Sequence, residues 1–456
     1  MTLWLFALSQ ATLVVFGLPA AFIPSIRRMS WASRLASSYA LGTILLALEG
    51  VLFSFVGWKW SYPGLAVPLL ILSAGGIWLQ RRLPAEPGVR GKVPAAVAMI
   101  ASVVCAVAVL ILYQGVISGR AMSVDLILFW GIKAARFAHA GGIDIPFMTW
   151  VYSTHAHANY PPLFPATLSW FALGRPEGLW KAAPLSTVIW FAAAIPLVFD
   201  SLRSRMSGSA AAATTAFWSA ALAAGLINAY SGGNAEAALI FFETAAISFL
   251  LFAPMETWKD GVAPGLFLAG AVFTKLEGSV ATGFILSGAV LVLLIARQWR
   301  GWWRPLLVAA AIPLVVALTW MSFMLMFDIP LRDPTHLTAT GIAFDHVEAI
   351  AAEEVLNSGF GTRGLSWILP LGVLIVFADR WNARLLLPMG FALALLAFTT
   401  FYYLVPRSDP SELIGWTFSR LMLPALSALI LGASDLLFGP VANQARGSVS
   451  SSSHER

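Results

Sequence analysis

The side chains best suited to chemistry in this chain are gathered in one polar stretch, residues 123–165, of an otherwise hydrophobic sequence. The stretch follows an apolar run that ends near Val116, and its acidic, basic and imidazole side chains are Asp125, Lys133, Arg136, His139, Asp144, His155 and His157. Such groups are costly in lipid, so we expect the stretch to face water or a polar cavity. A connector of this length is more often functional than idle, and we interpret it as a catalytic loop, with a plain extramembrane connector as the alternative.

Asp125 is the candidate catalytic residue. It comes soon after the apolar run, and a half-desolvated carboxylate at the end of a membrane span can be tuned to act as a general base. The alternative is that its carboxylate caps a helix expected from Leu126 onward. Both interpretations require Asp125 to lie at the boundary between the bilayer and the polar stretch.

Two basic residues are candidate phosphate partners, because fixed cations stabilise negative charge that develops on a phosphate. Lys275 lies at the tip of a tight turn beside Glu277, which is itself a candidate for ligand binding, and Gly278 allows the turn. The alternative for Lys275 is an interfacial lysine neutralised by Glu277, and the alternative for Arg420 is a headgroup anchor. Arg407 is a further candidate, although arginines are common in loops.

The histidines of the polar stretch do not define a metal site. His155 and His157 could ligate a metal with Asp125, but spacing fixes no third ligand, and the His-Glu-x-x-His arrangement is absent. We therefore expect no cofactor, with a divalent metal ion as the alternative, and we assign His157 a hydrogen-bonding role toward a ligand. No GxxxxGK[ST] phosphate loop occurs, so hydrolysis of soluble nucleotides is not expected.

Four more polar residues lie next to apolar runs or within one. Tyr160 precedes two prolines that fix an extended entry into the next helix, and it is also a candidate for ligand binding. Asn234 and Glu236 could hydrogen-bond a sugar, or they could cap the helix expected from Ala237. Glu49, isolated in an apolar run, is either paired within the bundle or functional.

Composition places these residues in a membrane protein. The chain has 456 residues, 59% hydrophobic and 11% charged, which predicts an all-α polytopic membrane protein. The net charge of +6 comes from clusters of arginine and lysine between apolar runs, so we interpret it as a topology signal and expect no nucleic-acid partner. The single cysteine, Cys105, permits no internal disulfide.

Apolar runs long enough to span, or nearly so, predict about thirteen transmembrane helices. We expect the first to be a retained span and not a signal peptide, because no basic residue precedes it. The runs cover residues 3–26, 35–57, 63–80, 94–117, 182–200, 209–229, 236–253, 262–276, 279–296, 305–327, 365–378, 385–404 and 416–438. Basic clusters occupy every second gap between them, which predicts an N-terminus outside and a C-terminus inside. Residues 163–174 must then form a short re-entrant or interfacial helix.

This topology collects the polar groups on one outer face. We expect residues 126–140 to form an amphipathic helix whose aromatic side chains lie on the membrane surface and which ends at Gly141 and Gly142. A second outer loop, residues 328–364, carries six acidic residues, two histidines and a predicted surface helix. We divide the chain into a three-helix module with its linker (1–90), a catalytic core (91–440) and a disordered cytoplasmic tail (441–456).

Four stretches in order resemble the GT-C superfamily of integral-membrane glycosyltransferases, such as the protein O-mannosyltransferases and the lipid A aminoarabinose transferase. They are the outer loop with Asp125, the helix after it and Tyr160-Pro161-Pro162-Leu163; Gly232 to Ala238 leading into Phe241-Phe242; Phe273-Thr274-Lys275-Leu276-Glu277-Gly278; and Phe418-Ser419-Arg420-Leu421-Met422-Leu423-Pro424. The resemblance covers roughly residues 95–438. A lone Asp125 stands where some relatives have an Asp-Glu pair, which leaves the acceptor or metal contacts open.

The resemblance implies an inverting transfer of a sugar from a polyprenyl-phosphate donor to an envelope lipid, glycan or protein. Asp125 would be the base, and Lys275 and Arg420 would hold the phosphate. The enzyme would lie among the lipids of a bacterial-type inner membrane, with its site on the periplasmic or extracellular face. The alternatives are a transporter or flippase of lipid-linked substrates, in which charge would be scattered near midmembrane, and an oligosaccharide ligase with a wider acceptor cleft.

Overall fold

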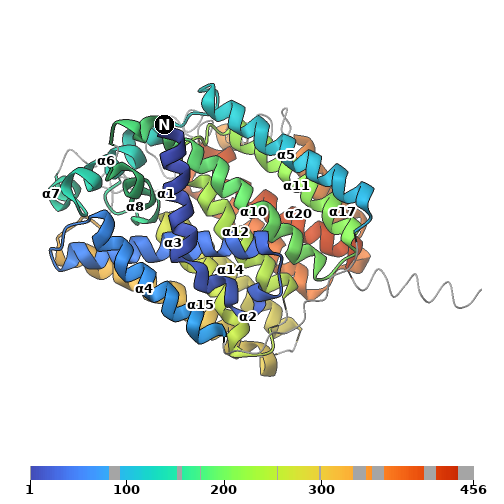
Figure 1. The fold of residues 1–456 in the computed structure, drawn as a ribbon. Coiled ribbons are helices and arrows are strands. Elements are labelled where there is room, and N and C mark those ends of the chain that lie inside the picture. The colour runs from blue at the N-terminus through green and yellow to red at the C-terminus, as the bar shows by residue number, and fades with distance from the viewer. Residues whose placement is uncertain are drawn as a thin grey trace, which may run out of the picture.

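A computed structural model describes residues 2–81, 93–150, 157–174, 176–253, 255–296, 299–331, 346–351, 364–404 and 417–439. Throughout these ranges the regular structure is helical, with no β-strand (Figure 1). One isolated β-bridge joins Met122 to Gly232. Eight of the helices are long and apolar enough to cross a membrane. The chain is therefore an all-α, multi-pass membrane protein, as the composition predicts.

The helices follow one another along the whole chain, and several of the predicted spans are shorter than a bilayer crossing requires. The elements are α1 (Thr2–Phe16), α2 (Pro24–Arg27), α3 (Trp31–Phe55), α4 (Tyr62–Arg81), α5 (Ala95–Ile117), α6 (Gly131–Ala140), α7 (Ile145–Thr149), α8 (Leu163–Ala172), α9 (Leu179–Ala182), α10 (Leu185–Arg203), α11 (Gly208–Asn228), α12 (Glu236–Phe252), α13 (Val262–Thr274), α14 (Leu276–Ile295), α15 (Trp299–Met326), α16 (His346–Ala351), α17 (Gly364–Val376), α18 (Leu386–Leu404) and α20 (Leu423–Phe438).

The first apolar run is not one helix. Helix α1 ends at Phe16, and a 3-10 turn (Leu18–Phe22) and the short α2 follow it. At this point α1 crosses α3 so closely that a Cβ on Gly17 would lie 1.8 Å from the carbonyl oxygen of Ser38. Glycine allows this approach of two backbones, and Pro19 and Pro24 then prevent a continuous helix. The apolar run over residues 3–26, predicted as one span, therefore consists of two helices separated by a 3-10 turn.

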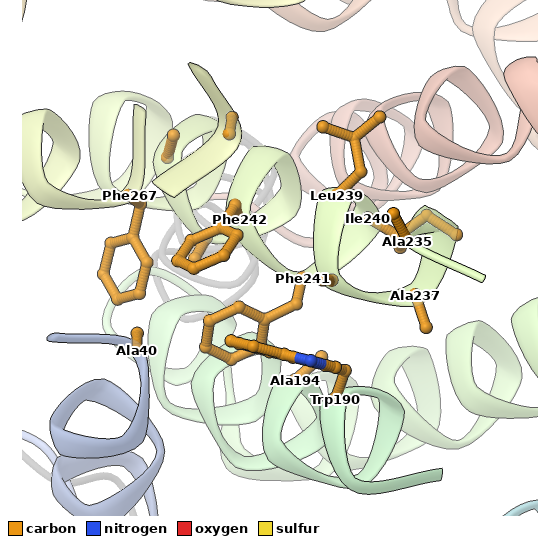
Figure 2. Packing of buried hydrophobic residues seen from close by; sticks show 14 of the residues in the cluster. Ala40, Trp190, Ala194, Ala235, Ala237, Leu239, Ile240, Phe241, Phe242 and Phe267 are labelled. Atoms are coloured by element: carbon orange, nitrogen blue, oxygen red, sulfur yellow. The ribbon is translucent and has the colours of Figure 1, made fainter. Parts of the chain in front are cut away.

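Helix α12 forms the centre of the bundle. All of its residues are buried, and it contacts α10, α13, α14, α18 and α20. Trp190 of α10 packs against Phe241 and Phe242 with both ring centroids 5.1 Å away (Figure 2). Aromatic contacts of this kind fix the rotation of α12 about its axis. The polar residues on α12 are therefore held in fixed directions.

Whereas α12 is completely buried, the helices at the outside of the bundle expose many apolar side chains. On α5, the exposed residues include Met99, Ile100, Val103 and Leu110. Hydrocarbon surface of this extent on a soluble protein would cause aggregation, whereas in a membrane protein it faces lipid. Helix α5 therefore lies at the lipid boundary, packed on α11 and α10 (Figure 1).

The polar gaps between helices gather at two opposite ends of the bundle. At one end, Asp200 in the last turn of α10 accepts a hydrogen bond from the backbone amide of Ser30, and Arg205 pairs with Asp435 near the end of α20. The turn Trp258–Gly261 contacts both α2 and α15, so the gap before α13 lies near the gap between α2 and α3. At the other end lie the turns before α12 and between α13 and α14, where the candidate residues meet.

The segment predicted as one amphipathic helix, residues 126–140, begins with a π-helical turn (Leu126–Trp130) and continues as α6. It ends at Gly141, whose φ of 61° is left-handed, as predicted. The prediction that its aromatic face lies on the membrane surface is wrong, because Trp130, Lys133 and Phe137 are buried inside the protein. The face packs on α8, the short helix expected near residues 163–174, which is itself completely buried.

Candidate functional site

The candidate site is formed where four chain segments far apart in sequence meet at one end of the bundle. They are the segment before the π-helical turn, the turn before α12, the α13–α14 turn, and residues 417–421 before α20. An ion-pair network joins them, and it consists of Asp125, Glu236, Lys275, Glu277 and Arg420. Each segment thus contributes at least one charged side chain to a single cluster.

Asp125 is held by backbone pairing between its own segment and the turn before α12. The amide of Gly232 donates to the carbonyl of Ala121 at 2.6 Å, and the amide of Ser123 donates to the carbonyl of Gly232 at 2.9 Å. Gly233 has a left-handed φ of 81°, and a Cβ there would lie 2.6 Å from the side chain of Leu126. The glycine pair therefore lets the two segments approach closely enough to place Asp125 next to Asn234.

Asn234 uses its whole side chain to hold Asp125. Its Nδ2 donates to Oδ2 of Asp125 at 2.9 Å and to the hydroxyl of Ser123 at 3.2 Å. Its Oδ1 accepts from the indole of Trp130 at 2.9 Å and from the backbone of Ala235 at 2.6 Å. An amide has two donors and one oxygen with two lone pairs, so nothing of Asn234 remains for a sugar. Asn234 is a positioning residue for Asp125.

The capping interpretations of these residues are wrong. Asp125 is the N-cap of the π-helical turn, but its side chain makes no capping hydrogen bond, and its Oδ2 contacts NH1 of Arg420 at 2.5 Å. Its other oxygen, Oδ1, accepts no hydrogen bond from any residue within the described ranges, and 18% of the side chain is exposed. The N-cap of α12 is Ala235, not Asn234 or Glu236. Asp125 therefore has one oxygen open toward a ligand.

Lys275 lies between two carboxylates at the α13–α14 turn. Its Nζ is 3.1 Å from Oε1 of Glu236 and 3.1 Å from Oε1 of Glu277, and only 8% of its side chain is exposed. Burial lowers the pKa of Lys275, but the two glutamates outweigh burial and hold the pKa above its ordinary value. The lysine is therefore a buried, charged group that pairs with Glu277, as the alternative interpretation expects, and with Glu236 as well.

Arg420 connects Asp125 to Lys275 through Glu236, which contacts both basic side chains. Its Nε is 3.9 Å from Oε1 of Glu236, and its NH1 contacts Asp125. Burial lowers the pKa of the guanidinium, while Glu236 and then Asp125 raise it, and the result is a pKa above the ordinary value. The Nε hydrogen is buried without a hydrogen-bond partner within the described ranges, so it can donate to a ligand.

Tyr160 and His157 form the wall of the cluster on the side of the polar stretch. The hydroxyl of Tyr160 donates to Oε1 of Glu277 at 3.2 Å, and the His157 ring stacks on the tyrosine at 4.8 Å between centroids. Burial and the charge of Glu277 raise the pKa of Tyr160 well above its ordinary value, so its hydroxyl stays a donor. Arg407 and His155 lie outside the described residues.

Lys133 contacts both His157 and Tyr160 and so helps to position them, a role that the sequence did not predict. Its Nζ donates a hydrogen bond to the carbonyl of His157, a residue with a left-handed φ of 47°, and lies 5.7 Å from the rings of Trp130 and Tyr160. Burial lowers the pKa of Lys133 to about 7. The only sequence signal was a lysine at an apolar-face position of the predicted helix.

The pKa of Lys133 predicts how stability depends on pH. An unfolded lysine titrates near 10.4. Between pH 7 and about 10 the unfolded chain therefore binds more protons at this residue than the folded chain, and stability rises with pH across that window. We expect the thermal midpoint of the wild type in detergent to rise between pH 7 and pH 9, and Lys133→Met to lose that rise. The exposed Lys259 offers the control, because Lys259→Met should keep it. An equal rise in both variants would show that Lys133 is not the group responsible.

No group of three or more histidine, cysteine or acidic side chains within the described ranges is arranged to hold a metal ion. Glu243, which sequence reasoning also missed, lies on α12 with 1% exposure and lines a narrow cavity shared with Glu236, Lys275, Glu277 and Arg420. Its sequence signal was an acidic residue inside an apolar run.

Comparison of the chain with known protein families, with curated proteins and with solved structures found no match. The resemblance to GT-C glycosyltransferases therefore stays a prediction, and the site has to be interpreted from its own chemistry.

Proposed function

We propose that this protein is a membrane glycosyltransferase of the GT-C type. It moves a sugar from a polyprenyl-phosphate carrier to an envelope lipid, glycan or protein, with inversion at the anomeric carbon. Asp125 acts as the general base, and Lys275 and Arg420 bind the donor phosphate. The reaction uses no cofactor.

One observation carries this proposal. The partly exposed carboxylate of Asp125, with one open oxygen, contacts the buried Arg420. Arg420 and the buried Lys275 both contact Oε1 of Glu236. General-base transfer needs an acid with an oxygen free to take a proton, and phosphate departure needs fixed cations close by. The Asp125–Arg420 contact puts the two requirements next to each other at 2.5 Å. A cluster built only for stability would not need an open oxygen on Asp125.

In the proposed step, Oδ1 of Asp125 takes the proton of the acceptor hydroxyl while the acceptor oxygen forms a bond to the anomeric carbon. The bond from that carbon to the phosphate oxygen breaks, and its electron pair stays on the phosphate. The phosphate then accepts hydrogen bonds from the unused Nε of Arg420 and from Lys275, which has one hydrogen beyond its two carboxylate partners. Proton, sugar and charge are thereby balanced.

The proposal includes a topology. The chain would cross a bacterial-type inner membrane about thirteen times, counting helices shorter than a full span. The cluster would lie on the periplasmic or extracellular face, opposite the basic gaps. At that face nucleotide sugars are lacking, which favours a lipid-linked donor. The module at residues 1–90 would support the core at residues 91–440.

The test is sugar release in liposomes. Purified protein is reconstituted with a panel of radiolabelled polyprenyl-phosphate sugars, and label is followed into water-soluble or acceptor-bound products. We expect the wild type to consume one donor and Lys275→Ala to consume none. The proposal fails if no donor in the panel loses its sugar at a rate above that of protein-free liposomes.

A second candidate function is transport of lipid-linked substrates. Two buried carboxyl groups on spanning or central helices favour it, because Glu49 on α3 and Glu243 on α12 each leave oxygen atoms without a hydrogen-bond partner within the described ranges. Ionisable residues inside membrane helices often mark substrate pathways. In the same liposomes, a donor that changes leaflet without losing its sugar would support transport.

A further inference from the structure

Two arginines next to the ends of apolar helices have no acidic partner. Arg304 lies near the beginning of α15, and Arg384 lies in a 3-10 turn (Ala383–Leu385) directly before α18. Neither guanidinium forms an ion pair or a hydrogen bond within the described ranges. Arg205, by contrast, pairs with Asp435. The N–H groups of Arg304 and Arg384 therefore remain available to a ligand.

Aromatic rings hold both guanidinium groups in place. The Cζ atom of Arg304 lies 5.2 Å from the ring centroid of Trp303, and that of Arg384 lies 5.9 Å from the ring centroid of Trp302. A guanidinium that stacks on an indole keeps the N–H groups at its edge free to donate. Trp302 packs against the hydrophobic core, so its position is fixed by the fold. Two separate segments thus place their arginines beside neighbouring tryptophans.

The two arginines lie at the end of the bundle opposite the ion-pair cluster. Helix α14 runs from the cluster, where Lys275 is its N-cap, to Ile295, and α15 begins a few residues later. The turn Trp258–Gly261 contacts both α2 and α15, so the basic gap between α2 and α3 lies near the same end. In the proposed topology this end faces the cytoplasmic leaflet, whose anionic lipids attract basic residues.

An apolar stripe on α15 begins one turn after Arg304. Its members are exposed and recur at intervals of three, four or seven residues, which places them on one face of the helix. They are Leu307, Leu314, Leu318, Met321 and Leu325. In a membrane protein such a face contacts the acyl chains of lipids. Arg304 therefore lies at the end of the stripe where the headgroup of the same lipid would be.

We propose that Arg304 and Arg384 bind the phosphate of an anionic phospholipid, and that an acyl chain of the same lipid lies on the apolar stripe of α15. The fork of a guanidinium matches two oxygens of a phosphate. Charge complementarity favours a headgroup with a net negative charge, because the ammonium group of a zwitterionic phospholipid would meet two cations. This lipid site is separate from the ion-pair cluster and does not rest on the proposed sugar transfer.

The test compares two lipids that differ in headgroup charge. Delipidated protein in detergent is titrated with phosphatidylglycerol or with phosphatidylcholine of the same acyl chains, and the lipid-bound states are counted by native mass spectrometry. We expect the first phosphatidylglycerol to bind the wild type about thirtyfold more tightly than phosphatidylcholine, because each basic residue close to an anionic lipid contributes roughly fivefold. Arg304→Gln and Arg384→Gln should each lose about fivefold, and the double variant should lose the whole preference.

Two further variants distinguish a built site from general attraction to a basic surface. Arg203→Gln is the control: it removes a guanidinium that lies 5.7 Å from the ring centroid of Phe199 on α10, and it should leave the preference unchanged. Arg304→Lys combined with Arg384→Lys keeps both charges but loses the planar fork and its stacking. We expect this double-lysine variant to bind phosphatidylglycerol about fivefold less tightly than the wild type. Circular dichroism checks that each variant is folded, and the two single glutamine variants decide the matter if the double variant is not.

Several outcomes would contradict the inference. Equal binding of the two lipids by the wild type would overturn it, as would a preference that survives in both single glutamine variants. If Arg203→Gln loses as much affinity as Arg304→Gln, or if the double-lysine variant binds like the wild type, the net charge of this end attracts the lipid and no site is built there. If farnesyl phosphate binds more tightly than phosphatidylglycerol and displaces it, the arginines hold an isoprenoid phosphate and the proposed occupant is wrong.

Discussion

Replacing Asp125 by asparagine is expected to lower sugar transfer by a factor of about 100 to 10,000, the range typical for loss of a general base. Asparagine keeps the shape of the side chain and can still accept hydrogen bonds from Asn234 and Arg420 through its carbonyl oxygen. It cannot take a proton from an acceptor hydroxyl at neutral pH. Initial rates in the liposome assay, at saturating donor, measure the loss.

The matched control is Asp144→Asn. Asp144 caps α7 through the backbone amide of Phe147 and pairs with Arg136 at 2.7 Å. The Asp144→Asn variant therefore undergoes the same chemical change in the same polar stretch, residues 123–165, but outside the cluster. We expect that variant to lose a little stability and no activity. Donor binding should be preserved in Asp125→Asn, because the phosphate contacts lie on Lys275 and Arg420. Turnover in Asp125→Asn above one tenth of the wild-type rate would rule out Asp125 as the base.

The all-helical membrane class and the set of turns that carry the site could both be predicted from the sequence. Composition determines the class, because a chain with so few charged residues has to bury its backbone polar groups in helices within lipid. Polar residues at the ends of apolar runs on one predicted side must meet at one end of a bundle. That is why Asp125 and Arg420, separated by 295 positions, could be expected near each other.

The direction in which each polar side chain points could not be predicted. A helical period shows that the segment around Lys133 has two faces, but in a membrane protein an apolar face can lie against lipid or against another helix. The structure buries that face on α8, which turns an expected surface helix into part of the site wall. The close backbone crossing at Gly17 could not be predicted for a similar reason, because hydropathy does not record how closely two helices approach.

The sequence also could not predict which groups each polar side chain contacts. Asn234 was expected to bind a sugar or cap a helix, whereas in the structure all its hydrogen-bonding groups are used within the protein. Glu243 looked like one more residue of an apolar run. Its importance depends on Trp190 and the phenylalanines that fix the rotation of α12, and these contacts are set by packing of separate helices (Figure 2).

Replacing Lys275 by methionine is expected to have the largest effect on stability. Methionine fills a similar volume but leaves the carboxylates of Glu236 and Glu277 buried without their shared cation. Breaking a buried ion pair by removing one partner costs about 3–5 kcal/mol, because the remaining charge stays desolvated. The thermal midpoint in detergent should fall by several degrees, and binding of farnesyl phosphate should be lost at the same time.

A triple variant separates the two effects. Adding Glu236→Gln and Glu277→Gln to Lys275→Met removes the unpaired charges, and replacing all members of a buried ionic group is often neutral for stability. We expect the triple variant to regain most of the thermal midpoint without regaining phosphate binding. Lys181→Met, at an exposed lysine, controls for loss of positive charge and should alter neither property. If the triple variant binds farnesyl phosphate as the wild type does, the lysine is a structural counter-ion for the two glutamates, and the phosphate site must lie elsewhere.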